Sequence, residues 1–193
     1  MSSVLGAQRS GERGVPPAIL LGGAIVAGCL LLVARLRMVG QPDVVRVFIA
    51  MYLVLGIGAL VAPVPAGGTQ RVGRFLVLAI GASAFALSSV FLGGRIPVSH
   101  GVGVIAVNSL AAVCEEAFFR RLTYGWLARG GAIVAIVGSA LLFALVHVPL
   151  YGAAVFWVDL GAGLVLSWQR WASGSWGISA ATHVWANLLA VAR

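Results

Sequence analysis

The chain carries two adjacent acidic residues, Glu115 and Glu116, in a segment that is otherwise apolar. Only five of its 193 residues are acidic, and the nineteen residues 96–114 hold no Asp, Glu, Lys or Arg. A charged group within hydrocarbon costs about 2.5 kcal/mol or more on insertion scales, so such residues usually face a polar cavity and serve a function. The pair therefore marks a candidate reactive site inside a membrane.

The two glutamates differ in the partners that a helix would offer them. Glu116 and Arg120 are four residues apart, so they share a helix face in the order that favours an ion pair. Glu115 is rotated by about 100° from Glu116 and has no obvious local partner. A carboxyl group in such surroundings suits a general base or acid. The alternative is that the pair marks a helix end at the membrane interface, where water would solvate both acids.

Two downstream apolar segments carry histidines at helical spacing. Phe143 and His147 share one face, so the phenyl ring could line a pocket that the imidazole enters. His183 and Asn187 also share a face and could donate two hydrogen bonds to an oxyanion, as in acyl transfer. A single histidine near a helix end, such as His147, can also be merely interfacial.

Two other polar residues have less defined roles. Asp159 could orient His147 or His183, or it could pair with an arginine, and both options stay open. His100 lies in an expected loop and is interpreted as a bystander. Helix rise places Glu115 and His147 at a similar depth, about 20–24 Å from one side of the membrane, and His183 at about 10–13 Å.

The composition is that of an integral membrane protein. Hydrophobic residues make up 61% of the chain and charged residues 9%, and the mean hydropathy is +1.04. A soluble domain would carry roughly 25% charged residues. The net charge of +8 comes from arginine alone, mostly between apolar runs, which suits contacts with lipid headgroups and argues against a nucleic-acid partner.

Intervals without charged residues predict an all-α fold: a polytopic transmembrane helical bundle of about seven spans, with the active site inside the bundle. We expect helices over 16–34, 44–64, 75–94 and 101–128, then one from the Arg129–Gly131 break to Val148, stopped by Pro149, and two more over 151–168 and 176–192. The chain divides into an N-terminal tail (1–15), transmembrane helices of unassigned role (16–100) and a catalytic helical core (101–193).

The arginines give a weak indication of orientation. With seven spans, the side of the N-terminus carries eight arginines and the opposite side five. The positive-inside rule then favours a cytoplasmic N-terminus. The arginines on the first side are Arg9, Arg13, Arg71, Arg74, Arg120, Arg121, Arg129 and Arg170.

Three of these patterns together resemble the CAAX-protease and bacteriocin-processing (CPBP, or Abi) family of intramembrane proteases. Glu115–Arg120 matches the family's EExxxR motif, Phe143–His147 its FxxxH and His183–Asn187 its HxxxN, in the same order and on separate apolar segments. The resemblance covers roughly residues 101–192 and implies an all-helical membrane endopeptidase.

The resemblance also implies roles for these residues. Glu115 and His147 would activate the attacking water, His183 and Asn187 would bind the oxyanion, and Glu116, Arg120 and Phe143 would support them. A metal-free, glutamate-type mechanism is favoured, and no cofactor is expected. Zinc held by Glu115, His147 and His183 is the alternative.

The expected substrate is a membrane-embedded or membrane-tethered protein or peptide, and the bilayer is the other partner. The arginine-rich, lysine-free chain with its Ala, Gly and Val bias indicates a GC-rich bacterium, hence the bacterial plasma membrane. Two other functions stay open: a non-catalytic immunity or scaffold protein, and a small proton-coupled transporter, because acids and histidines in spans also form proton relays.

Overall fold

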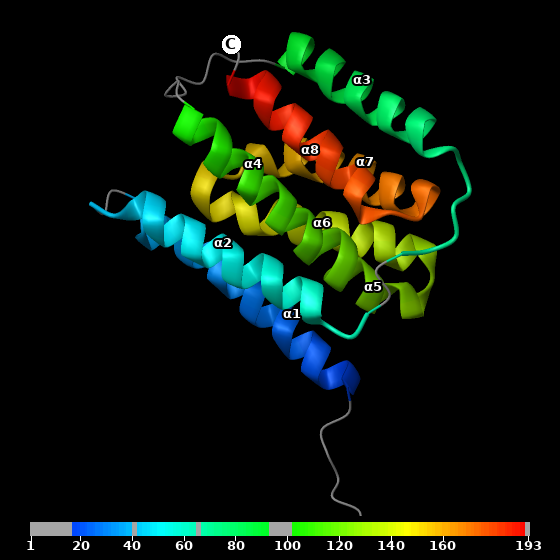
Figure 1. Cartoon of the computed structure of the whole chain (residues 1–193), viewed down its shortest axis with the longest axis horizontal. Helices are drawn as coiled ribbons and strands as arrows, with labels where there is room; N and C mark the ends of the chain where they lie inside the picture. Colours follow the sequence, from blue (N-terminus) through cyan, green and yellow to red (C-terminus); the bar gives the residue numbers. More distant parts are fainter. Residues whose placement is uncertain (1–16, 40–41, 65–66, 93–101, 192–193) are drawn as a thin grey trace, which may run out of the picture.

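The computed structural model describes residues 17–39, 42–64, 67–92 and 102–191, and over these ranges its regular elements are helices (Figure 1). The predicted all-α helical bundle is therefore confirmed. The tail 1–15, Pro65 and the loop with Arg95, Pro97 and His100 lie outside the described residues. The long helices are α1 (Pro17–Ala34), α2 (Val44–Val61), α3 (Arg74–Leu92), α4 (Val102–Glu116), α6 (Ala132–Tyr151), α7 (Val155–Ser173) and α8 (Trp176–Val191).

Four continuous helical stretches of the described chain are long and apolar enough to cross a membrane. They are Pro17–Arg37, Val44–Val61, Val102–Gly130 and Ala132–Tyr151. Their apolar side chains are largely exposed, as with Ile19, Val54 and Ile133, which suits contact with lipid acyl chains. The protein is accordingly an integral membrane protein.

The rod that carries the two glutamates changes its helical form directly after them. α4 ends at Glu116, a π-helical segment covers Ala117–Thr123, and α5 (Tyr124–Leu127) and a 3₁₀ turn (Ala128–Gly130) complete the rod. The predicted break then follows, where Gly131 adopts a φ of 99° that favours glycine. A π-helical turn frees backbone carbonyls from their usual partners and is frequent at functional sites.

The predicted end of the next helix at Pro149 is wrong. α6 continues through Pro149 to Tyr151, and Gly152, with a φ of 87°, ends it by donating its N–H to the carbonyl of Val148. Proline removes only one donor, and such a defect is tolerated in membrane helices. α7 consequently begins at Val155 and ends at Ser173, a few residues later than expected.

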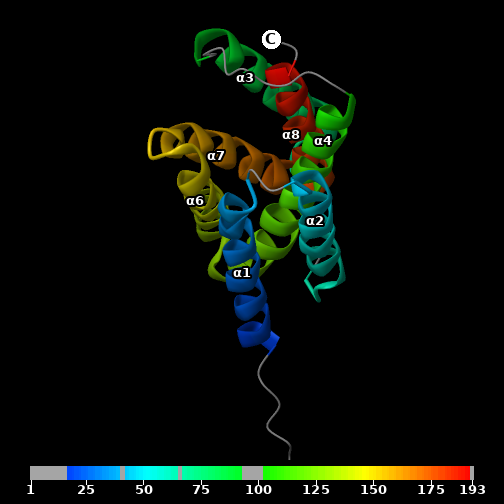
Figure 2. The same ribbon diagram turned by 90° about the vertical axis from the view of Figure 1, so that its left-hand side faces the viewer.

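α4 lies at the centre of the arrangement, between α2 on one side and α8 on the other, and α6 and α7 pack along each other (Figures 1 and 2). α3 covers α8 and α7, and α1 contacts α6 and the π-helical segment. Small residues permit the close contacts of α1 and α2 with the central rod. A Cβ on Gly28 would lie 2.2 Å from Phe118, and one on Gly56 would lie 2.7 Å from the Sγ of Cys114.

The arginines that were expected to face lipid headgroups are in several cases buried. Arg35, Arg120, Arg121 and Arg170 are each at most 8% exposed. Arg121 shows the reason, because its guanidinium donates to the carbonyls of Ala59, Ala62 and Val64. It thus satisfies backbone groups that the end of α2 leaves without partners. The four guanidinium groups thus bind partners inside the protein.

Candidate active site

The predicted catalytic residues border one cavity inside the bundle. Its volume is about 440 Å³, and α4, α6, α7 and α8 all contribute to its wall. The polar residues that line it are Arg35, Tyr52, Asn108, Glu115, Tyr151, His147, Asp159, His183 and Asn187, with Phe143 among the apolar ones. Three separate helices therefore bring the three sequence motifs to the same space.

Glu115 is buried and held by two residues from the N-terminal helices. Its Oε1 accepts hydrogen bonds from Arg35 Nη1 at 2.9 Å and from the hydroxyl of Tyr52 at 3.2 Å. Arg35 also donates to the Tyr52 oxygen at 2.6 Å. The expected lack of a local partner holds, because Arg35 and Tyr52 are 80 and 63 residues away from Glu115 in the sequence. The guanidinium charge compensates a carboxylate that would otherwise be very costly at 4% exposure.

His147 faces the other oxygen of Glu115. Its Nε2 lies 3.9 Å from Glu115 Oε2, a separation that a single water can bridge. Its Nδ1 lies 2.7 Å from the carbonyl of Phe143, one turn earlier on α6, to which it can donate. Asp159 Oδ2 lies 3.7 Å from the same nitrogen of His147. Asp159 was expected to lie beside a histidine or an arginine, and the structure places it beside His147.

Glu116 connects the first and third motifs. Its Oε1 lies 3.0 Å from His183 Nδ1, and its Oε2 lies 3.2 Å from Arg120 Nε in an ion pair whose angles fall outside hydrogen-bond geometry. The expected pair of Glu116 and Arg120 is thus present, with both side chains fully buried. The helix rise predicted a shallower depth for His183 than for Glu115. In the structure His183 contacts Glu116, the residue next to Glu115.

Phe143 and Asn187 complete the wall of the cavity. The phenyl ring of Phe143 lies 4.6 Å from the His147 ring and 5.8 Å from the His183 ring, and the Arg120 guanidinium sits 4.6 Å from its centre. The Phe143 ring therefore packs against both imidazoles and against the buried Arg120 guanidinium. Asn187 donates one amide hydrogen to the carbonyl of Asn108 at 3.1 Å, which leaves the second for a ligand.

The interfacial alternative for the acidic pair is wrong, because Glu115 is 4% exposed and Glu116 is fully buried. The three residues considered for zinc, Glu115, His147 and His183, each have other contacts. Across the described ranges, no group of three or more His, Cys, Asp or Glu side chains is arranged to hold a metal ion. His183 directs its Nδ1 to Glu116, and the Arg35 guanidinium on Glu115 would repel a cation.

Four polar residues of the cavity were not predicted from the sequence: Arg35, Tyr52, Asn108 and Tyr151. Arg35 and Tyr52 come from segments to which no role was assigned, and Tyr151 was placed beyond the end of α6. The Tyr151 ring lies parallel to that of His147, with centres 5.9 Å apart. In the sequence, Arg35 looks like any arginine that follows a membrane span. Nothing in the neighbouring residues indicates that it is buried beside Glu115.

This fold and this cavity define an integral membrane protein with an internal cluster of carboxylates and imidazoles. Residues 97–189 match the family model described as type II CAAX prenyl endopeptidase, Rce1-like. The three motifs lie within this segment, and the match confirms the resemblance drawn from them. No curated protein and no solved structure matches the chain.

Proposed function

We propose that the protein is an intramembrane endopeptidase in which Glu115 and His147 activate water to hydrolyse a peptide bond. The observation that carries the proposal is the 3.9 Å separation of Glu115 Oε2 and His147 Nε2 within a polar cavity of the bundle. Two hydrogen-bond acceptors at this separation can each bind one hydrogen of the same water. The lone pairs of that water are then free to attack a carbonyl carbon.

The two oxygens of Glu115 have different roles in the proposed mechanism, because they have different contacts. Arg35 and Tyr52 hold Oε1, which leaves Oε2 to accept the proton of the attacking water. His147 keeps Nε2 free as an acceptor when its Nδ1–H donates to the Phe143 carbonyl. After attack, Glu115 returns the proton to the nitrogen of the leaving amine, so that the carboxylate is regenerated.

The oxyanion is stabilised by donors from α8. Asn187 has one uncommitted amide hydrogen, and His183 in its protonated form donates Nδ1–H to Glu116 and Nε2–H toward the cavity. Arg120 supplies a positive charge beside the Glu116 carboxylate. Loss of one oxyanion donor typically lowers the rate by about 10²–10³-fold.

The substrate is a membrane-embedded or membrane-tethered protein or peptide, and the membrane is the bacterial plasma membrane. The cavity lies within a bundle whose outer surface is apolar, so a substrate reaches it most directly from the bilayer. No metal takes part in the proposed mechanism. The guanidinium of Arg35 supplies the positive charge beside Glu115.

The test uses the purified protein in lipid nanodiscs and a panel of palmitoyl-anchored, internally quenched peptides, with products identified by mass spectrometry. Glu115→Gln and His147→Ala are expected to lower cleavage by about 10²-fold or more, because each removes an acceptor for the attacking water. Asp43→Asn is the matched control, since Asp43 is exposed and pairs with Arg46. Its activity is expected to equal that of the wild type.

Further measurements distinguish this function from its alternatives: an immunity or scaffold protein, a proton-coupled transporter and a zinc-dependent protease. Cleavage by Glu115→Gln at the wild-type rate would reject the glutamate mechanism, and complementation of a deletion strain by this variant would favour an immunity or scaffold role. Proton-coupled uptake of a solute without any cleavage would favour a transporter. Full activity after exhaustive chelation is expected, and restoration of lost activity by zinc would contradict it.

A further inference from the structure

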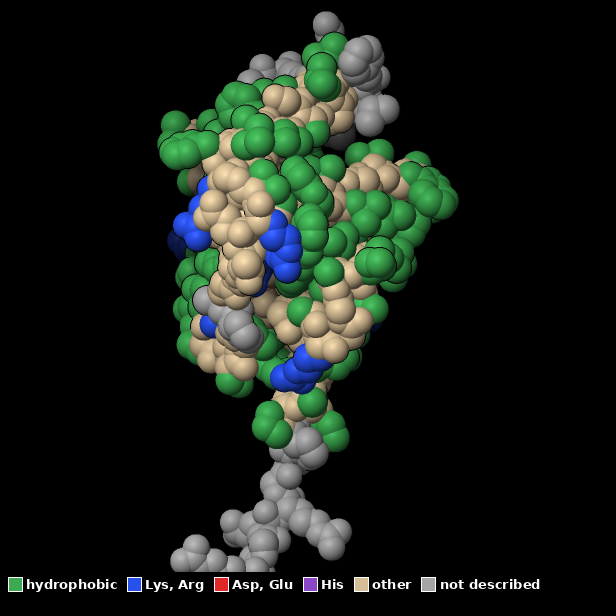
Figure 3. All heavy atoms as spheres, turned by 90° about the vertical axis from the view of Figure 1, so that its right-hand side faces the viewer, with side chains coloured by type: hydrophobic (Ala, Val, Ile, Leu, Met, Phe, Trp, Pro, Cys, Tyr) green, Lys and Arg blue, Asp and Glu red, His purple; other side chains and the backbone are tan. Residues whose placement is uncertain are grey.

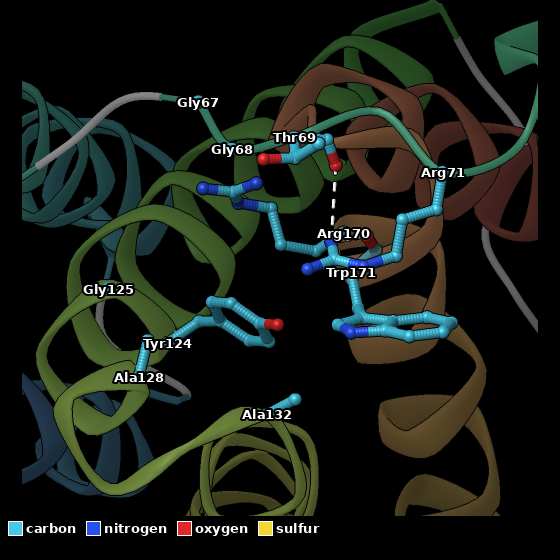
Figure 4. Close-up of a pocket in the computed structure, with 10 residues that line it drawn as sticks. All are labelled: Gly67, Gly68, Thr69, Arg71, Tyr124, Gly125, Ala128, Ala132, Arg170 and Trp171. Carbon is cyan, nitrogen blue, oxygen red and sulfur yellow. Dashed lines mark hydrogen bonds between the residues drawn. The ribbon is translucent and has the colours of Figure 1, made fainter.

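A second cavity lies at the other end of the bundle, where the chain between α2 and α3 meets the ends of α5 and α7 (Figure 4). Its volume is about 260 Å³. The side chains that give it chemical character are Arg71, Tyr124, Arg170, Trp171 and Thr69. The cavity shares no lining residue with the one that contains Glu115.

The loop that forms one wall is firmly attached to the end of α7. The N–H of Gly68 donates to the carbonyl of Gly174 at 2.9 Å, and that of Arg71 donates to the carbonyl of Ala172 at 2.9 Å. Gly174 has a φ of 69°, and a Cβ there would lie 2.3 Å from the Gly68 oxygen, so this contact requires glycine. The wall is therefore built in advance of any ligand.

Arg170 is the most informative residue of this cavity, because it is a buried cation with no counter-ion among the described residues. It is 4% exposed, and its Nε donates to the carbonyl of Arg120 at 3.1 Å. Its terminal nitrogens have no hydrogen-bond partner or acid in the described part of the chain, and they lie beside Gly68 and over the Tyr124 ring (Figure 4). A buried charge of this kind favours a bound anion.

Arg71 brings a second positive charge to the same space. Its guanidinium lies 4.8 Å above the centre of the Trp171 ring, and its Nη1 donates to the carbonyls of Thr69 and Trp171. Both bonds use the same nitrogen, so Nη2 and Nε remain available (Figure 4). Two guanidinium groups with free N–H donors match the oxygens of a phosphate group.

The four acidic residues in the described ranges are all committed elsewhere. Asp43 pairs with Arg46, Glu115 with Arg35, Glu116 with Arg120, and Asp159 lies beside His147. Figure 3 looks at this end of the molecule and shows arginine side chains around the loop and no acidic ones on that face. The charge of Arg71 and Arg170 is therefore not balanced by these acids.

We propose that this cavity binds an anionic phosphate group, held between Arg71 and Arg170. The site lies at helix ends and includes a tryptophan and a tyrosine, residues that are typical of the membrane interface. Both the headgroup of an anionic lipid and free phosphate carry this chemistry. The proposal is independent of the protease function, because binding does not require the Glu115 cavity.

The test measures lipid retention by native mass spectrometry on the full-length protein, released from nanodiscs of equal parts phosphatidylglycerol and phosphatidylcholine. We expect phosphatidylglycerol to be retained in preference to phosphatidylcholine. Arg71→Gln should weaken this retention about tenfold, because it removes a charge-assisted contact. Arg74→Gln is the matched control, since Arg74 is exposed and does not line the cavity. Gly67→Glu is a second variant that introduces a competing carboxylate without altering either arginine.

A competition experiment with inorganic phosphate shows whether the bound phosphate group belongs to a lipid headgroup or to free phosphate. Displacement of the lipid by millimolar phosphate would identify a site for free phosphate, whereas retention of the lipid would identify the headgroup; both results support the site. Equal retention of phosphatidylglycerol by Arg71→Gln, Gly67→Glu and Arg74→Gln would overturn the proposal. So would the absence of preference for phosphatidylglycerol together with no binding of phosphate.

Discussion

Glu115 has two oxygens with different surroundings, and the residues responsible come from outside the three motifs. Oε1 accepts from Arg35 and Tyr52, whereas Oε2 faces His147 across a gap that suits a water. A carboxylate that was free to rotate would present either oxygen to the imidazole only part of the time. Arg35 and Tyr52 are thus best described as positioning residues for the proposed general base.

Tyr52→Phe tests this positioning, because it removes one hydroxyl group and little volume. The variant should lose a hydrogen bond to a charged acceptor, and kcat should fall about tenfold or more with a smaller change in KM. The measurement is cleavage of the best peptide from the anchored panel by the protein in nanodiscs. Tyr124→Phe, which removes a hydroxyl outside this cavity, serves as the control.

A merely structural role for Tyr52 makes a different prediction. It would lower the unfolding temperature and leave kcat per folded molecule unchanged. An unchanged kcat in a stable Tyr52→Phe protein would therefore contradict the positioning role. Arg35→Ala is a poorer test, since it would leave the Glu115 carboxylate buried without its counter-ion.

At the scale of the elements, the π-helical segment Ala117–Thr123 links the acidic pair to its supports. Two of its carbonyls accept hydrogen bonds from other helices. Ser139 Oγ on α6 donates to Phe119 at 2.8 Å, and Arg170 Nε on α7 donates to Arg120 at 3.1 Å. These side chains stabilise a helical form that the local sequence alone would not favour.

Ser139→Ala should therefore destabilise the protein by about 1–3 kcal/mol, because it leaves the buried carbonyl of Phe119 without its partner. Thermal unfolding in detergent measures the effect. The control is Ser88→Ala, since Ser88 bonds the carbonyl of Phe85 within its own helix and is only partly buried. Equal unfolding temperatures for the two variants would show that the π-helical segment does not depend on Ser139.

The helices themselves could largely be predicted from the sequence, and the reason is physical. Charged residues are excluded from the bilayer core, so charge-free intervals located α1, α2, α3, the α4 rod and α8 to within a few residues. The boundary at Pro149 was wrong because proline stops soluble helices more strictly than membrane helices. The π-helical segment could not be predicted, since it depends on Ser139 and Arg170 from distant parts of the chain.

For the whole molecule, the cavity combines side chains from both sides of residue 100, because Arg35 and Tyr52 line it together with the three motifs. The motifs were recognisable because acids and histidines are conspicuous in apolar segments. Arg35 and Tyr52 were not, because an arginine after a span and a tyrosine within one are ordinary features of membrane proteins. The matched segment 97–189 thus lacks two side chains that contact Glu115.

The contact of α2 with the central rod can be tested with a disulfide to a native cysteine. A Cβ at position 56 would lie 3.2 Å from the Cβ of Cys114, close to the spacing in disulfides. Gly56→Cys should therefore cross-link to Cys114 on oxidation. Gly58→Cys, whose Cβ would meet no atom within 4 Å, should not.

The readout uses a protease site inserted between residues 96 and 97, so that cleavage separates the N-terminal helices from the segment with the three motifs. Under non-reducing conditions the two fragments should remain joined in oxidised Gly56→Cys and separate in Gly58→Cys. If α2 holds Tyr52 against Glu115 throughout the reaction, the cross-linked protein should keep its peptidase activity before cleavage of the chain. Loss of activity on oxidation that returns on reduction would mean instead that α2 must move away from the rod during turnover. Failure of Gly56→Cys to cross-link would contradict the arrangement that brings the N-terminal helices to the active site.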